Sequence, residues 1–236
     1  MRLVGAATKS MAHTNKKHGI GSLISPVYFG MLKHLSLKHR LQVEFLRKHN
    51  RLPNLDLPET YSEKIAWRKL ADRDQRLPIW SDKVKVKELV ASKIGSKYTL
   101  PNLWMGRNPG DIPLNELAKP YVIKTSNGSG GVTFIREGQP IFAEKIRKEV
   151  KAHLDNPFAT HTDEWPYGKI SPRIIVEPML LEHHGALPVD YKFHVFSGKT
   201  QFIQVDVGRF HNHRRDFYDP TWKKQSFELK YPMLDR

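Results

Sequence analysis

The chain has 236 residues, of which 39% are hydrophobic and 27% charged, so it can build one large domain or two small ones around a packed core. It has no cysteine, which excludes a disulfide framework, a thiolate metal site and cysteine catalysis. The formal net charge is +15, but the first fifty residues carry nine Lys/Arg and one acid, Glu44, so more than half of the excess lies there. The remainder is mildly basic and suits an enzyme for anionic substrates as well as a polynucleotide binder.

Residues 1–38 form a basic leader with poor hydrophobic patterning. The leader lacks the pattern of a signal peptide, and no apolar run in the chain approaches the length of a membrane span. We therefore expect a cytoplasmic protein whose leader could contact the anionic inner face of the membrane.

The next region, residues 39–120, is predicted to be largely helical. Apolar residues at helical spacing predict one helix over residues 39–50. Thr60 and Glu63 have the spacing of a capping box, which predicts the start of a second helix. A third helix is expected to begin after Asp82, a residue type that favours the N-cap position.

The rest of the chain is predicted to be mostly strands. We expect a short strand or edge segment at 98–101, a hairpin at 121–135, a helix at 142–154, an apolar strand at 173–181, and a hairpin at 190–206. Helices followed by hairpin, helix, strand and hairpin predict an α+β fold rather than a regular βαβ array.

The most informative segment is the loop of the hairpin at 121–135. An apolar strand ends in Lys124, and a loop of small residues follows, which includes Asn127, Gly128, Ser129, Gly130 and Gly131. Glycine permits positive φ angles, so backbone amides can face an anion, and the lysine adds a full positive charge. The arrangement suits nucleotide phosphates, although it has neither the Gly-Lys-Ser/Thr of a P-loop nor dinucleotide-fingerprint spacing. A plain glycine-rich loop explains the segment alone equally well.

Five segments in a fixed order carry a more specific signal. They are residues 61–67, 81–87, 122–130, 174–180 and 190–199. This series closely resembles the TupA-like branch of the ATP-grasp superfamily, which is associated with bacterial surface polysaccharide and teichuronopeptide synthesis. The resemblance covers roughly residue 40 to the end. It implies an ATP-grasp fold, in which two α+β subdomains grip a nucleotide; residues 121–236 would hold the lid and the start of the C-terminal ATP-binding subdomain.

The resemblance also implies which residues bind ATP. Lys124 and the loop from Asn127 to Gly131 match the lid over the phosphates, and Lys83 matches a second phosphate-side lysine. Taken alone, Lys83 is better explained as a solvated helix lysine. Glu177 would begin the hinge beside adenine, followed by Pro178, Met179 and Leu180.

Two further positions fall near the expected ribose. Asp190 lies where such enzymes often place a carboxylate on the ribose hydroxyls, and a turn residue is its plain alternative. Lys192 shares a strand face with Asp190 by period two, so a salt bridge between them is an equally simple interpretation.

The segment from Asp206 to Tyr218 resembles the family pattern Asp-x-x-Arg-Phe-x-x-His-x-Arg. Arg209, Arg214 and Arg215 could bind the γ-phosphate or an acidic acceptor and are the candidate catalytic residues. A basic loop is the simpler interpretation. His211 and His213 lack partners at metal-ligand spacing, so we expect no metal there.

The cofactors implied by the resemblance are ATP and Mg²⁺. In the family, acidic residues on a later strand hold the metal, and this chain ends before such a segment. We therefore expect that the chain is truncated at its C-terminus and that the metal ligands, unknown here, lie beyond Arg236.

The implied reaction is ATP-dependent ligation of a carboxylate to an amine or another nucleophile through an acyl phosphate. The expected partner is a small-molecule or saccharide acceptor with a carboxylate, and no specific nucleic acid. Two alternatives stay open: a glycosyltransferase of capsule or cell-surface polysaccharide assembly, usually with an Asp-x-Asp metal motif, and a catalytically incomplete nucleotide-binding protein. A polyanion or RNA binder is supported by the charge, but aromatic residues do not cluster with basic stripes.

Overall fold

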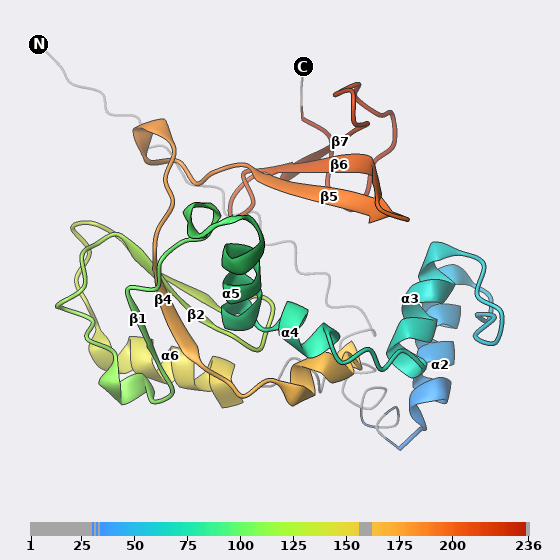
Figure 1. The fold of residues 1–236 in the computed structure, drawn as a ribbon, viewed down its shortest axis with the longest axis horizontal. Coiled ribbons are helices and arrows are strands. Elements are labelled where there is room, and N and C mark those ends of the chain that lie inside the picture. The colour runs from blue at the N-terminus through green and yellow to red at the C-terminus, as the bar shows by residue number, and fades with distance from the viewer. Residues whose placement is uncertain (1–29, 31, 33, 156–161, 235–236) are drawn as a thin grey trace, which may run out of the picture. The chain divides into compact units, whose positions relative to one another are not determined.

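The computed structural model describes residues 30, 32, 34–155 and 162–234 (Figure 1). Most of the expected basic leader therefore lies outside the described residues. Contacts divide the chain into two compact units: Met1–Trp80 with Phe158–Lys169, here the helical unit, and Ser81–Pro157 with Ile170–Arg236, here the mixed unit. The three-region organisation expected from the sequence is not tested by this division and stays a prediction. No helix in the described part is long and apolar enough to cross a membrane.

The helical unit contains the two helices expected at its start. Helix α2 spans Leu37–His49 and helix α3 spans Tyr61–Leu70. The predicted capping box is confirmed, because the Thr60 side chain accepts from the backbone of Glu63 and the Glu63 side chain accepts from the backbone of Thr60. Phe45, Leu55 and Ala66 form the small core between these elements. The described residues of this unit also include most of the short helix α4, Leu77–Ser81, and the 3-10 helix η3, Trp165–Lys169.

The mixed unit is built around a four-stranded antiparallel sheet in the order β1-β4-β2-β3. The strands are β1 (Trp104–Gly106), β2 (Tyr121–Thr125), β3 (Val132–Ile135) and β4 (Ile174–Pro178). The predicted hairpin at 121–135 and the predicted apolar strand after residue 173 are both confirmed. The expected strand at 98–101 is wrong, because Ser96–Tyr98 forms a 3-10 turn closed by Thr99 onto the Ser96 carbonyl.

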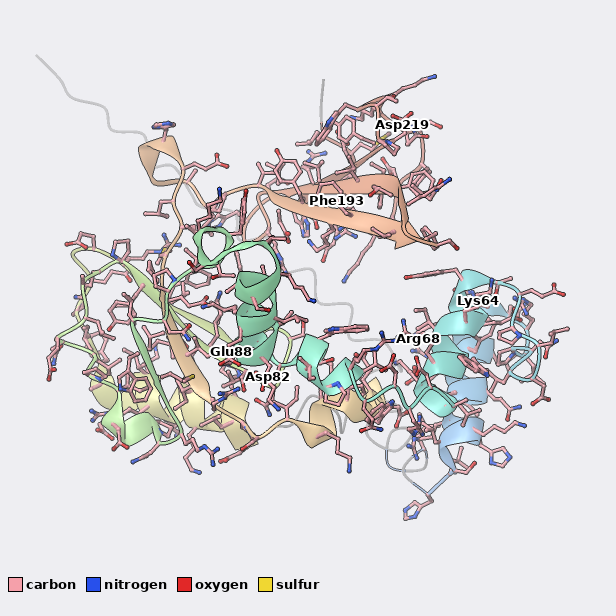
Figure 2. The ribbon with its side chains drawn as sticks, viewed as in Figure 1. Lys64, Arg68, Asp82, Glu88, Phe193 and Asp219 are labelled. Atoms are coloured by element: carbon pink, nitrogen blue, oxygen red, sulfur yellow. The ribbon has the colours of Figure 1, made fainter. Side chains whose placement is uncertain are left out.

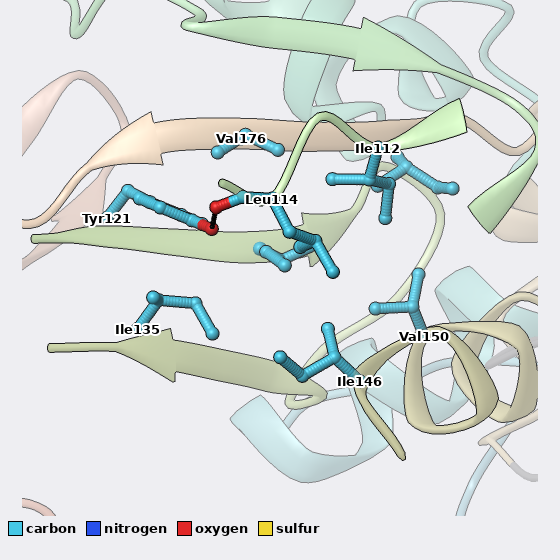
Figure 3. Close-up of a cluster of buried hydrophobic side chains, with 9 residues drawn as sticks. Ile112, Leu114, Tyr121, Ile135, Ile146, Val150 and Val176 are labelled. Atoms are coloured by element: carbon cyan, nitrogen blue, oxygen red, sulfur yellow. Dashed lines mark hydrogen bonds between the residues drawn. The ribbon is translucent and has the colours of Figure 1, made fainter. Parts of the chain in front are cut away.

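One face of this sheet is packed against helix α6, which spans Ala143–Asp155 and confirms the helix predicted at 142–154 (Figure 3). The face is made by alternate strand residues such as Tyr121 and Val176, because side chains alternate along a strand. Ile146 and Val150 of the helix fill the space opposite them. Residues of the opposite parity, including Lys124 and Glu177, therefore belong to the other face.

Helix α5 spans Lys83–Ile94 and begins at the predicted N-cap, Asp82, whose carboxylate accepts from the backbone of Val84 and Lys85 (Figure 2). It ends at Gly95, whose backbone N–H donates to the Ala91 carbonyl. Its first residue, Lys83, lies on the loop that joins β2 and β3, since its backbone N–H donates to the Ser126 carbonyl at 3.2 Å.

A second antiparallel sheet has the order β5-β6-β7, with β5 Asp190–Phe196, β6 Lys199–Val207 and β7 Arg214–Tyr218. Ser197 and Gly198 both have positive φ angles, 48° and 77°, so the predicted hairpin closes with a tight turn. Helices plus two antiparallel sheets give the α+β fold that the sequence predicts.

Candidate functional site

The loop between β2 and β3 has the open backbone expected of a ligand-binding loop. Gly130 and Gly131 have φ angles of 82° and 57°, which residues with side chains rarely adopt. A Cβ on Gly131 would come within 2.8 Å of the His153 ring, whereas a Cβ on Gly130 would meet nothing within 4 Å. Gly131 is thus fixed by packing, and Gly130 leaves its backbone accessible. Ser129 beside it is exposed.

Asn127 lies deeper in the same loop. The residue is 3% exposed, and its Oδ1 atom is buried without a hydrogen-bond partner within the described part of the chain. Buried polar atoms are nearly always paired, so an unpaired oxygen here requires an explanation. A donor supplied by a ligand or by water would satisfy it.

Lys83 is not the solvated helix lysine that its sequence context alone favours. Its Nζ atom donates to the backbone carbonyls of Thr125, at 2.8 Å, and Gly128. Burial lowers the pKa of Lys83, and the positive charge of Lys124 lowers it further. The first residue of α5 therefore delivers a positive charge into the glycine-rich loop.

Lys124 is held by a carboxylate from the neighbouring strand. Because Val122 pairs with Glu177 and Lys124 with Ile175, Lys124 and Glu177 are diagonal neighbours on one face. The Lys124 Nζ atom lies 2.6 Å from Oε2 of Glu177. The structure thus joins two residues that the resemblance assigned separately to phosphate and adenine.

A second lysine, Lys87, binds the other oxygen of the same carboxylate. Its Nζ atom lies 2.8 Å from Oε1 of Glu177 and 2.6 Å from Oδ1 of Asn102. Burial alone would raise the pKa of Glu177, but hydrogen bonds from Lys124 and Lys87 outweigh it, and the net pKa is lowered. The sequence analysis missed Lys87, although its spacing of four residues from Lys83 places both on one side of a helix. We call Lys83, Lys87, Lys124 and Glu177 the lysine cluster.

The start of α5 is anchored by Arg173, another residue that the sequence analysis missed. Its Nη2 atom lies 3.0 Å from Oδ2 of the buried Asp82. Its backbone N–H donates to Ser126 Oγ at 3.0 Å, and its carbonyl accepts from the Ser126 backbone at 2.8 Å. The glycine-rich loop therefore begins from a fixed position.

The expected adenine hinge after Glu177 offers few backbone N–H groups that a base could use. Pro178 has no N–H, and the N–H of Met179 donates to the Pro120 carbonyl at 3.0 Å. Leu180 is exposed, and its N–H makes no hydrogen bond within the described part of the chain. Leu180 is therefore the hinge residue whose donor is available to a base edge.

The second sheet contains a dense ionic cluster around Asp206, a residue that is 2% exposed. Its carboxylate accepts hydrogen bonds from four side chains: Lys192 at 2.8 Å, Gln204 at 2.7 Å, His213 at 2.9 Å and Arg215 at 2.6 Å. We call these five residues, Asp206 included, the Asp206 cluster. Burial alone would raise the pKa of Asp206, but the donors, led by Arg215, hold it well below its usual value. Lys192 also pairs with Asp190, which is the salt bridge considered from the sequence.

The three arginines proposed as catalytic all contact their own chain. Arg209 lies 2.9 Å from Asp190, Arg214 donates to the Met233 carbonyl at 3.2 Å, and Arg215 binds Asp206. Arg209 is the most exposed of them, with 56% of its side chain accessible. Their roles toward a phosphate or an acceptor stay predictions, and Arg209 is the arginine that is most accessible to solvent.

The segment that carries Arg209 touches the glycine-rich hairpin. The ring of Phe210 lies edge-on to that of Phe134 in β3, with centroids 5.1 Å apart. This contact, within the mixed unit, connects the arginine segment to the hairpin that carries Lys124.

The sequence contains one Asp-x-Asp, at Asp72 and Asp74 in the helical unit. Arg68 lies 2.9 Å from Asp72, and Arg76 lies 2.6 Å from Asp74 (Arg68 is labelled in Figure 2). Hydrogen bonds from Arg76 lower the pKa of Asp74 to about 2. Both carboxylates are therefore used by neighbouring arginines.

Among residues 34–155 and 162–234, no group of three His, Asp or Glu side chains gathers as a metal-binding set. Glu177 and Asp206 each use both carboxylate oxygens to accept from cationic or amide groups. The described carboxylates of the mixed unit thus do not present a ready ligand set for a hard cation.

The comparisons with known proteins gave one match. A family model described as TupA-like ATPgrasp matches residues 63–236. No curated protein and no solved structure matches the chain.

Proposed function

Because the chain belongs to the TupA-like ATP-grasp family, we propose that it is an ATP-dependent ligase that joins a carboxylate to an amine or another nucleophile. The match covers residues 63–236 and so includes the lysine cluster, the glycine-rich loop and the Asp206 cluster. The substrate would be a sugar acid or an amino acid in bacterial surface polysaccharide assembly, a role inferred from the family alone.

The observation that carries the proposal is the convergence of Lys83, Lys124 and the glycine-rich loop. Lys83 approaches the loop from a helix, and Lys124 lies at the base of the loop on a strand. Two lysines bind the Glu177 carboxylate and a third, Lys83, binds the adjoining loop, so this half-buried place has an excess of positive charge. Such an excess favours a polyanion, and two lysines from different elements can bind different oxygens of a triphosphate.

The polar atoms left without partners fit the same ligand. The accessible backbone at Gly130 can approach a phosphate closely, and Leu180 offers an N–H to the acceptor edge of a base. The unpaired Oδ1 atom of Asn127, within the loop, is an acceptor, so its partner would be a hydroxyl or amino group of the nucleotide and not a phosphate oxygen.

In the proposed reaction, a carboxylate oxygen of the substrate attacks the γ-phosphorus of ATP, and the bond to the β,γ-bridging oxygen breaks. The products of this step are an acyl phosphate and ADP. The amine then attacks the acyl carbon, inorganic phosphate leaves, and the nitrogen loses one proton. The chain's own contribution would be electrostatic and positional: Lys83 and Lys124 hold phosphates, and Arg209 can neutralise charge on the transferring group or on the acceptor.

Members of this superfamily use Mg²⁺ with ATP, and a bound metal would neutralise phosphate charge. The described carboxylates do not fit that role as they stand, because Glu177, Asp190 and Asp206 are all engaged by cationic groups. No step of the proposed mechanism is therefore assigned to a metal.

The proposal is tested first by calorimetry with ATP and Mg²⁺. We expect a dissociation constant on the order of micromolar to millimolar and a loss of at least about tenfold in Lys124→Ala, since one charged phosphate contact is removed. Lys148→Ala, an exposed lysine on α6, is the matched control and should bind as the wild type does.

GTP and UDP-glucose complete the experiment. Folded protein that binds neither ATP nor GTP would contradict the proposal, and binding of UDP-glucose alone would favour the glycosyltransferase. A positive result leads to assays of acceptor-dependent release of ADP and phosphate.

A further inference from the structure

Glu177 binds a lysine, Lys124, that the proposed function also assigns to the nucleotide phosphates. The carboxylate is 6% exposed, and each of its oxygens accepts from a different lysine. Lys124, on the strand that leads into the glycine-rich loop, is also the lysine proposed to bind phosphate. A phosphate that draws the Lys124 ammonium toward the loop would lengthen its contact of 2.6 Å with Glu177, so the two anions compete for one positive charge.

We infer that Glu177 and a nucleotide phosphate compete for Lys124, and that Lys87 is a positioning residue that keeps Glu177 paired when Lys124 moves to the phosphate. This inference rests on the proposed function, because it presumes that ATP binds at the glycine-rich loop. It assigns a role to a side chain that touches no part of the nucleotide.

Lys124 and Lys87 differ in their exposure and in the number of contacts that hold them. Lys124 is the more exposed, with 28% of its side chain accessible against 20% for Lys87. Lys87 is held from two sides, by Glu177 at 2.8 Å and by Asn102 at 2.6 Å, and it projects from the regular helix α5. Among the residues that the structure describes, the side chain of Lys124 has no hydrogen bond other than that to Glu177. Lys124 is thus the partner that can leave, and Lys87 is the partner that stays.

The reason why Lys87 is needed follows from the burial of Glu177. A buried carboxylate that loses its last cationic partner is strongly unfavourable, because its charge is then neither hydrated nor paired. With Lys87 present, departure of Lys124 leaves Glu177 with one ion pair. Without Lys87, Lys124 would be the sole partner of Glu177 and would be held against it. The affinity for ATP should then fall even though no phosphate contact has been removed.

The test measures ATP binding by Lys87→Met, Glu177→Gln and the double variant. We expect Lys87→Met to weaken ATP binding by about tenfold, a change typical of one ionic coupling. Adding Glu177→Gln should restore most of that affinity, because a neutral amide no longer competes for Lys124. Lys87→Arg should stay within about threefold of the wild type, since it keeps the ion pair. Lys85→Met, an exposed lysine on the same helix, is the control.

Binding of adenosine serves as a second measurement. The competition involves phosphate only, so Lys87→Met should bind adenosine as the wild type does. Wild-type affinity for ATP in Lys87→Met would overturn the inference, as would a loss that Glu177→Gln fails to restore. If adenosine binding falls together with ATP binding, the effect is structural and the inference is wrong. Absence of ATP binding by the folded wild type would overturn the proposed function and this inference together.

Discussion

The lysine cluster and the Asp206 cluster both bury a carboxylate among cations, but they differ in what holds it. Glu177 accepts from two lysines, whose flexible side chains end in compact charges. Asp206 accepts from an arginine, a lysine, a histidine and a glutamine, and β5, β6 and β7 all contribute. A carboxylate held by two flexible lysines can lose one of them to a ligand. A carboxylate held by four donors from several elements is better suited to fixing the strands of a sheet.

The Asp206 cluster is fixed further by aromatic packing. The His213 ring stacks on that of Tyr231 with centroids 3.6 Å apart, and the Arg215 guanidinium lies 4.8 Å from the same ring. No comparable stacking involves Lys87 or Lys124 within the described residues. The comparison therefore predicts that changes at Asp206 affect stability most, and that changes at Glu177 affect ligand binding most.

The largest effect is expected for Asp206→Asn. Neutralising this residue leaves Arg215, whose side chain is only 12% accessible, beside an amide, and removing one partner of a buried ionic group costs about 3–5 kcal/mol. Glu177→Gln should cost less, about 1–3 kcal/mol, because Lys87 and Lys124 are both partly accessible to water. Urea unfolding of the two variants, with Glu88→Gln on the exposed side of α5 as control, measures the difference (Glu88 is labelled in Figure 2). Equal losses at the two positions would contradict the comparison.

A smaller effect is expected on the pH dependence of stability. The folded-state pKa of Asp206 is lowered, so the stability it contributes is present above its unfolded pKa of about 4 and is lost as the pH falls below it. The pKa of Glu177 is lowered too, so the stability that it contributes is also lost as the pH falls. We expect the stability of the wild type to fall more between about pH 5 and 3 than that of Asp206→Asn, with Glu177→Gln intermediate.

The measurement is the urea midpoint of each protein at several pH values, each referred to its own value at pH 7. Glu63 in the helical unit also has a lowered pKa, caused first by Arg51, but it is common to all three proteins. An acid limb of the same slope in the wild type and in Asp206→Asn would show that Asp206 is not responsible.

Sequence reasoning predicted the α+β fold because its signals were local. The capping box at Thr60, the N-cap at Asp82 and the turn at Ser197 each follow from residues within a few positions of one another. The strand expected at 98–101 failed because the residues there form a 3-10 turn that Thr99 closes onto Ser96.

The site could be predicted only in part, because its pairings are distant in sequence. Lys124 and Lys83 were identified through the family resemblance, but Lys87 on α5 and Glu177 on β4 are separated by 90 positions and meet only through tertiary packing. Arg173 reaches Asp82 across 91 positions for the same reason. Such contacts depend on where helix α5 packs relative to β4, and period and composition do not encode that.

The smallest expected effects concern two neutral amides, Gln204 in the Asp206 cluster and Asn102 beside the lysine cluster. Gln204 is buried and donates to Asp206 at 2.7 Å, whereas Asn102 is exposed and accepts from Lys87 at 2.6 Å. Gln204→Met should cost about 1 kcal/mol, the usual value of one hydrogen bond, since three cationic or histidine donors stay on Asp206. Asn102→Ala should cost less than about 0.5 kcal/mol, because water replaces the amide oxygen and Glu177 still holds Lys87. Urea unfolding resolves this difference only if both variants are measured side by side with the wild type. A larger loss at Asn102 than at Gln204 would mean that Lys87 is fixed mainly by Asn102, and the lysine cluster would then be the more rigid of the two.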